Sequence, residues 1–183
     1  MQKTQRVNSR PALFNDLQSA CLHQANQFDQ LLMNLRFEGK ASFGRNLMAV
    51  RKATDFFRNE VNEHIAFEES IIFPYLVSHL PKLDFVIHVL QSEHEIFKKN
   101  FEDLKLHLSI LSDGALSAKR LKALHKLQEV STCLVYLVRN HIWVESKSVY
   151  ELAERELRPD EKKNLEGQMK NFSKRFQEKR VRL

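Results

Sequence analysis

The chain contains few of the residues that interrupt helices or cross-link small folds. Its 183 residues include four glycines, four prolines and two cysteines. So few turn-forming residues favour long helices with few connections, and two cysteines are too few for a disulfide framework. We expect Cys21 and Cys133 to be small buried side chains in a protein of a reducing compartment.

Long apolar runs are also missing. No stretch approaches the roughly 20 apolar residues that cross a bilayer, and the first residues, MQKTQRVNSRPALF, lack the apolar segment of a secretory signal. We therefore expect a cytoplasmic protein with no membrane contact. The length and the hydrophobic content of 43% indicate one globular domain with its own core.

The net charge of +6 is concentrated at the end of the chain. Residues 158–183 contain nine Lys or Arg and four Asp or Glu, so the rest of the chain is nearly neutral. This distribution does not predict nucleic-acid binding. The basic tail is typical of a solvated C-terminal helix, and the alternative is a docking surface for an acidic protein partner.

Apolar residues recur at helical spacing, and no strand-like alternation is present. The pattern predicts four long helices, at about residues 10–37, 42–79, 82–111 and 117–157, with turns at Gly39 and Gly114 and a kink at Pro74. Short connections make neighbouring helices antiparallel. We predict an all-α protein, an up-down-up-down four-helix bundle over residues 1–158 with a short amphipathic C-terminal helix over residues 159–183.

Two strings on separate predicted helices can bind a metal ion: His64-Ile-Ala-Phe-Glu68 and His141-Ile-Trp-Val-Glu145. Residues four apart on a helix lie on one face, so each string stacks an imidazole on a carboxylate. The spacing also arises by chance, as His125 and Glu129 show. His125 lies about 160° around the helix from His141, so we predict that it is on the surface.

The joint placement of the histidines carries more weight than the spacing. A lone histidine, His23 or His94, precedes each string on the preceding predicted helix, by 41 and 47 residues. Similar intervals place these side chains at a similar depth in a bundle, where helical proteins build metal sites. We expect His79, His88 and His107 to be structural or solvated. The predicted ligands are His23, His64, Glu68, His94, His141 and Glu145.

This ligand set also indicates the metal. Imidazoles and carboxylates without thiolates suit iron or manganese better than a cysteine-based structural zinc site. Six side chains are too many for one ion with an open position, but they fit two ions bridged by Glu68 and Glu145. Bare buried carboxylates would cost several kcal/mol in desolvation, so the ions would also stabilise the bundle. We expect two iron ions, with manganese or zinc also compatible.

The order of these motifs resembles the hemerythrin-like HHE cation-binding domain over about residues 10–157. The motifs are a lone histidine, the run from His64 to Pro74 with its HxxxEE start, Glu93-His94, and the string from His141 to Glu145. The resemblance implies a four-helix bundle around a non-heme di-iron centre. Oxygen-carrying members have a further histidine where this chain has Lys98, and an aspartate in place of Ser146.

The set is more similar to the branch of iron-centre repair and nitric-oxide response, although repair proteins also have a cysteine-containing N-terminal domain, which is not seen here. Glu60 and Glu93 are acidic in that branch too, and are either outer carboxylates of the centre or solvated charges. The favoured function is binding or sensing of O2, NO or peroxide in nitrosative or oxidative stress. The alternatives are an iron store or donor whose basic tail docks a partner, and a di-iron oxidase or peroxidase, so enzymatic activity stays open.

Overall fold

The computed structural model describes residues 12–37, 41–112 and 117–181, without the side chains of residues 12–17, 117, 173 and 175–181. The predicted turns at Gly39 and Gly114 lie outside these ranges. The described part is almost entirely helical and contains no strand, which confirms the all-α prediction. None of its helices is both long enough and apolar enough to cross a membrane.

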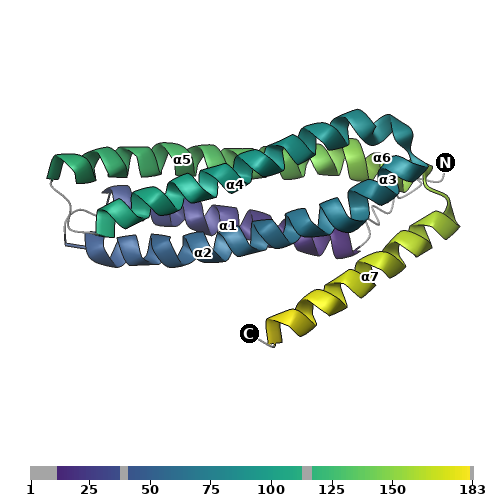
Figure 1. Ribbon diagram of the computed structural model, residues 1–183, viewed down its shortest axis with the longest axis horizontal. Helices are drawn as coiled ribbons and strands as arrows, with labels where there is room; N and C mark the ends of the chain where they lie inside the picture. Colours follow the sequence, from purple (N-terminus) through teal and green to yellow (C-terminus); the bar gives the residue numbers. More distant parts are fainter. Residues whose placement is uncertain (1–11, 38–40, 113–116, 182–183) are drawn as a thin grey trace, which may run out of the picture.

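Four long helices dominate the molecule: α1 (Ala12–Phe37), α2 (Phe43–Phe67), α4 (Asp84–Ser112) and α5 (Ser117–Val144). They pack in a ring, since α1 contacts α2 and α5, and α4 contacts the same two helices. Figure 1 shows these four helices side by side along the long axis of the molecule. The last helix, α7 (Pro159–Val181), leaves this group at an angle.

The predicted helix over residues 42–79 is continuous but not uniform. After α2 the chain forms a π-helical segment, η1 (Glu68–Ile72), and returns to α-helix in α3 (Phe73–His79). Pro74 has no N–H to donate to the carbonyl four residues earlier, so an ordinary α-helical turn would lose a bond here. The expected kink is thus a widened turn, and the helix continues to His79. The short 3₁₀ segment η2 (Pro81–Leu83) then leads into α4.

A second π-helical segment interrupts the predicted helix over residues 117–157. It is η3 (Glu145–Tyr150), and it is followed by the short helix α6 (Glu151–Glu156). No proline lies in or near this segment, and Leu157 adopts an extended conformation that ends α6 before α7 begins at Pro159. The helical span was therefore predictable, whereas the widened turn inside it was not.

The apolar core is divided into two clusters. One fills the space between α1, α2, α4 and α5, where the rings of Phe28 and Phe101 lie 5.6 and 5.5 Å from that of Phe57. The other is built from η1, α3, the start of α4, η3, α6 and α7. On α4, Leu90 belongs to the second cluster and Phe97 to the first, and the fully buried His94 lies between them. A polar layer therefore lies between two apolar ones.

The helix α7 packs against the second cluster. Leu165 and Met169 are buried there, and the ring of Phe172 lies 5.1 Å from that of Phe67. The Tyr75 hydroxyl also donates a hydrogen bond of 2.8 Å to the backbone carbonyl of Glu161. One face of the tail helix is thus part of the core, and its other face is exposed to solvent.

The two cysteines differ in burial. Cys21 on α1 is buried, as expected, and its Sγ lies 3.9 Å from the backbone carbonyl of Glu60. Cys133 is exposed, so the expectation of a second buried thiol is wrong. Cys133 lies on the outer face of α5, next to the exposed Tyr136 three residues later on the same face.

Substitution of a buried residue tests the packing of α7. We expect Met169→Ala to lower the free energy of unfolding by about 2–5 kcal/mol, because it removes a fully buried side chain and leaves a cavity. The neighbouring exposed variant Lys170→Ala should change it by less than about 0.5 kcal/mol. Urea denaturation followed by circular dichroism measures both, and equal small effects would show that α7 does not pack on the bundle.

Candidate metal centre

The two His-x3-Glu strings meet in the polar layer. Glu68 is the first residue of η1 and Glu145 is the first residue of η3, and neither side chain is exposed. His64 and His141 lie one turn earlier, on α2 and α5. Each of these four residues offers a ligand atom, and all four atoms lie within 4.8 Å of one another. Functional sites often contain such widened turns.

The helix α4 adds a third imidazole. His94 Nε2 lies 3.3 Å from Glu68 Oε2 and 3.2 Å from His141 Nε2. The ring of Phe73 stacks almost parallel to the His94 imidazole at 5.9 Å and covers one of its faces. The structure therefore brings together five of the six predicted ligands.

Each carboxylate has one oxygen near His64 and the other near the remaining imidazoles. His64 Nε2 lies 2.9 Å from Glu68 Oε1 and 3.4 Å from Glu145 Oε2. His141 Nε2 lies 3.5 Å from Glu145 Oε1 and 3.8 Å from Glu68 Oε2. Each carboxylate therefore faces imidazoles on both of its sides.

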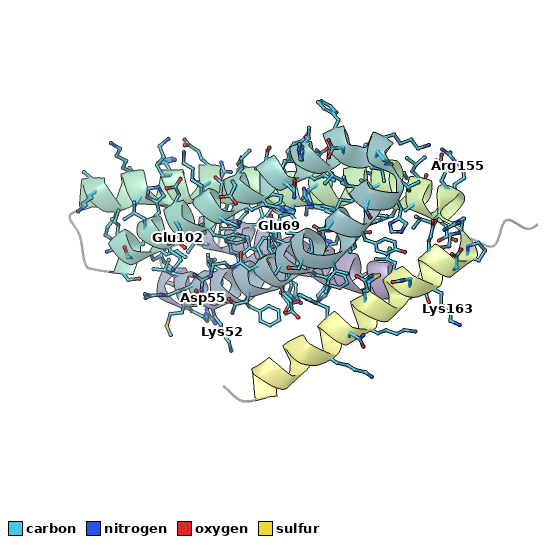
Figure 2. All side chains as sticks on the ribbon, turned by 45° about the vertical axis from the view of Figure 1, so that its right-hand side comes forward. Lys52, Asp55, Glu69, Glu102, Arg155 and Lys163 are labelled. Carbon is cyan, nitrogen blue, oxygen red and sulfur yellow. The ribbon has the colours of Figure 1, made fainter. Side chains whose placement is uncertain are left out.

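Outer carboxylates hold two of the imidazoles. Glu69 Oε1 lies 2.8 Å from His94 Nδ1, and Glu93 Oε2 lies 2.7 Å from His141 Nδ1. Such contacts fix the tautomer and turn Nε2 inward, as they do around metal ions. Of the two readings of Glu93, its contact favours the outer carboxylate. The role of Glu69, at the middle of the molecule in Figure 2, was missed, although the second glutamate of HxxxEE is its signal.

The structure does not bring His23 to this centre. Its side chain is exposed on α1, whereas Gln18 is buried and faces the carboxylates. Gln18 Nε2 donates to Glu145 Oε2 at 3.3 Å, and Ser146 Oγ donates to Gln18 Oε1 at 2.8 Å. Five residues of α-helix turn a side chain by about 140°, so Gln18 and His23 cannot share this face. The position expected for an imidazole holds an amide.

Tyr150 is a further residue of the centre that sequence reasoning missed. Its hydroxyl donates a hydrogen bond of 2.8 Å to Glu68 Oε1. Residues five apart are hydrogen-bonded neighbours in a π turn, and η3 therefore aligns Tyr150 with Glu145. Burial and the charges of Glu145 and Glu68 raise the pKa of Tyr150 well above 10, which keeps it a neutral donor.

A small cavity lies between η3, α6 and α7, next to this tyrosine. Its volume is about 20 Å³, and Tyr150 is one of the residues that line it, together with Leu157, Leu165 and Met169. This volume holds about one water molecule. Tyr150 is therefore shared by the cavity and the centre.

The charges of the centre are balanced by protons in the absence of a metal ion. Burial alone would lower the pKa of His64, but Glu68 and Glu145 outweigh it and raise the pKa well above 6.5. The same competition raises the pKa of His141 to about 11. Burial favours a higher pKa for Glu68, yet His64 and its hydrogen-bond partners hold it well below 4.5. A bound cation would replace these protons.

Buried atoms without hydrogen bonds indicate that the residues fit a cation. Within the described residues, His64 Nε2, Glu68 Oε2 and Glu145 Oε1 are buried and have no hydrogen-bond partner. Each such atom costs about 1–3 kcal/mol, and cations bound on the two sides of the carboxylates would satisfy all three. Nitrogen and carboxylate oxygen donors suit iron, manganese and zinc.

The remaining histidines lie outside the centre, as predicted. His79, His88 and His125 are exposed, and His107 is partly buried. Lys98, at the position of the additional histidine of oxygen carriers, is also exposed and pairs with Glu95 at 2.6 Å. Burial thus separates His64, His94 and His141 of the centre from the other histidines.

The shifted pKa values predict how the metal-free protein responds to pH. A raised histidine pKa stabilises the fold fully below about pH 6.5, and this stabilisation is lost as the pH rises towards 11. The lowered pKa of Glu68 stabilises the fold above about pH 4.5 and is lost below it. We expect the Tm of metal-free protein, measured by calorimetry, to fall between pH 6.5 and 9. The exposed variant His125→Gln should follow the same curve, and a Tm that rises over this range would contradict the assignment.

The centre has the composition of a known family. The family model described as "Hemerythrin HHE cation binding domain" matches residues 19–153, which include both His-x3-Glu strings and His94. No curated protein and no solved structure matches the chain. The match covers most of the sequence and all five of the predicted ligand residues that the structure brings together. The chain therefore belongs to the hemerythrin HHE cation-binding domain family.

Proposed function

We propose that this protein binds non-heme iron in the polar layer and uses it to bind a small ligand, O2, NO or peroxide. The observation that carries the proposal is that buried imidazole Nε2 atoms and buried carboxylate oxygens converge on one place. In two of these imidazoles the other ring nitrogen, Nδ1, contacts an outer carboxylate, Glu69 or Glu93. Such a set is built to hold a cation rather than to pack a core. The proposed ligands are His64, Glu68, His94, His141 and Glu145.

The positions of the carboxylate oxygens favour two ions over one. Glu68 and Glu145 each direct one oxygen towards His64 and the other towards His94 or His141. Bridging carboxylates of this kind hold two ions in helical bundles. The ligand count is lower than expected from the sequence, because His23 does not contribute.

The burial of the centre limits what reaches it. Glu68, His94 and Glu145 have no exposed surface, and apolar clusters lie on both sides of the layer. Iron at this place would supply coordination of a small molecule and electron transfer to it. The protein residues exclude bulk water and orient the imidazoles. The Tyr150 hydroxyl donates a hydrogen bond to a carboxylate oxygen of Glu68. This enclosure favours a diatomic molecule or peroxide over a larger substrate.

We further propose that the ring of α1, α2, α4 and α5 is the up-down-up-down bundle of the family, over residues 1–158. Residues 159–183 are a basic segment outside this ring, and one face of α7 packs on the second apolar cluster. Exposed lysines such as Lys163 and Lys170 give α7 a positive outer face, and Lys163 projects from this helix in Figure 2. An acidic protein partner fits this face. Loss of partner binding in the double variant Lys163→Glu with Lys170→Glu, with unfolding unchanged, would support it, because both side chains are exposed.

Metal analysis tests the proposed function directly. After loading with excess iron(II) under anaerobic conditions, the protein should hold about two iron ions per chain. His141→Ala should lower iron affinity by about tenfold or more, whereas His125→Ala should leave it unchanged, because only the former side chain lies in the centre. Equal losses from both variants would refute the ligand assignment.

The outer carboxylate provides a second test. We expect Glu93→Gln to weaken iron binding by about 10–100-fold, because the His141 ring would lose the carboxylate that orients it. Glu95→Gln is the matched control, since this exposed residue lies on the same helix and contacts Lys98. Calorimetric titration with iron(II) measures both, and an unchanged affinity in Glu93→Gln would show that the contact is incidental.

Ligand binding separates the favoured function from its alternatives. Addition of NO to the reduced, iron-loaded protein should change its visible spectrum, and removal of NO should reverse the change. Catalytic consumption of peroxide with many turnovers would favour an enzyme instead. Release of iron to an acceptor lacking its iron–sulfur cluster would favour an iron donor.

A further inference from the structure

The two halves of the centre repeat one another in sequence and in space. The string from His64 to Glu68 at α2 and η1 corresponds to the string from His141 to Glu145 at α5 and η3. Gln18 precedes His64 by 46 residues, and His94 precedes His141 by 47. Gln18 on α1 is therefore the counterpart of His94 on α4.

The partners of these two residues correspond as well. Glu69, five residues after His64, contacts His94 Nδ1 at 2.8 Å. Ser146, five residues after His141, donates to Gln18 Oε1 at the same distance of 2.8 Å. A histidine–glutamate pair in one half is thus matched by a glutamine–serine pair in the other.

A third correspondence concerns the outer carboxylate. Glu93, immediately before His94, contacts His141 Nδ1. The residue immediately before Gln18 is Leu17, which has no carboxylate. In line with this difference, His64 Nδ1 is buried and has no hydrogen-bond partner among the described residues. One half of the centre therefore has its ligand orientation built in, and the other half does not.

The carboxylate oxygens show the same asymmetry. The two that face His64 already accept hydrogen bonds, Glu68 Oε1 from Tyr150 and Glu145 Oε2 from Gln18. The two that lie on the side of the other imidazoles, Glu68 Oε2 and Glu145 Oε1, accept none within the described chain. An ion beside His64 would compete with two protein donors for its carboxylate oxygens. An ion on the other side would find both carboxylate oxygens free and would replace only the hydrogen bond of 3.2 Å between His94 Nε2 and His141 Nε2.

We propose that the two metal positions are unequal, and that Gln18, Ser146 and Tyr150 make them so. The first ion binds tightly beside His94 and His141, with two imidazoles and two free carboxylate oxygens. The second binds weakly beside His64. There Ser146 orients the Gln18 amide so that its N–H group points to Glu145, and its oxygen is not available to coordinate the ion. This inference rests on the proposed metal-binding function, and it makes the second ion the exchangeable one.

Titration of the metal-free full-length protein with iron(II), under anaerobic conditions, tests the inference without any variant. Isothermal calorimetry should resolve one tight equivalent and a second equivalent about 10–100-fold weaker, the range expected for loss of outer-shell support. Two equivalents of equal affinity would overturn the inequality while supporting the metal site. Absence of iron binding would overturn the proposed function itself.

The responsible residues are tested by exchange between the halves. The double variant Gln18→His with Ser146→Glu copies the His94–Glu69 pair into the other half, and it should strengthen the second step about tenfold or more while leaving the first unchanged. The mirror variant, His94→Gln with Glu69→Ser, should abolish the tight step. His23→Ala is the control and should alter neither step, because this side chain is exposed on α1.

Folding of each variant is checked by circular dichroism before titration. A folded Gln18→His, Ser146→Glu protein whose second step stays weak would refute the assignment to these residues. If that variant does not fold, Tyr150→Phe replaces it, because it frees Glu68 Oε1 without adding a charge. It should strengthen the second step, and an unchanged second step would count against the proposal.

Discussion

Two carboxylates buried without any exposed surface, Glu68 and Glu145, are the constraint on which the rest of the centre depends. Ionised carboxyl groups in an apolar interior are costly unless cations and hydrogen-bond donors surround them. The imidazoles of His64 and His141, whose pKa values are raised, meet this demand as protonated groups, and a bound metal ion would meet it in their place. These buried polar side chains form a layer across the interior, and this layer divides the apolar core into two clusters.

The side chains of the layer come from packed helices, and contacts on their outer sides orient several of them. Phe73 covers one face of the His94 ring, and Glu69 holds its outer nitrogen. Such support would orient the imidazole before an ion binds, which would reduce the ordering cost of binding. The His64 ring has no such partner at Nδ1, so the imidazoles of the two halves differ in how firmly they are oriented.

The helices and the convergence of five of the six expected ligand residues could be predicted, because both follow from periodicity and spacing along single helices. The sequence placed His23 wrongly because the depth and rotation of α1 relative to the other helices depend on packing that no local pattern encodes. A signal for Gln18 existed: its interval of 46 residues to His64 nearly equals the 47 between His94 and His141. No comparable signal marks η3 or Tyr150, since the widened turn there contains no proline.

The segment η3 also has a consequence for the C-terminal helix. A π turn contains about one residue more than an α turn, so the residues after it are rotated by about 100° from where an unbroken α-helix would place them. The rotation that η3 introduces after Glu145 therefore also determines the direction in which the chain leaves Leu157 and enters α7. Loss of a single residue within 145–150 would restore an α-helical phase. Tyr150 would then turn away from Glu68, and α7 would turn away from the second apolar cluster. The polar layer and the basic helix therefore both depend on η3.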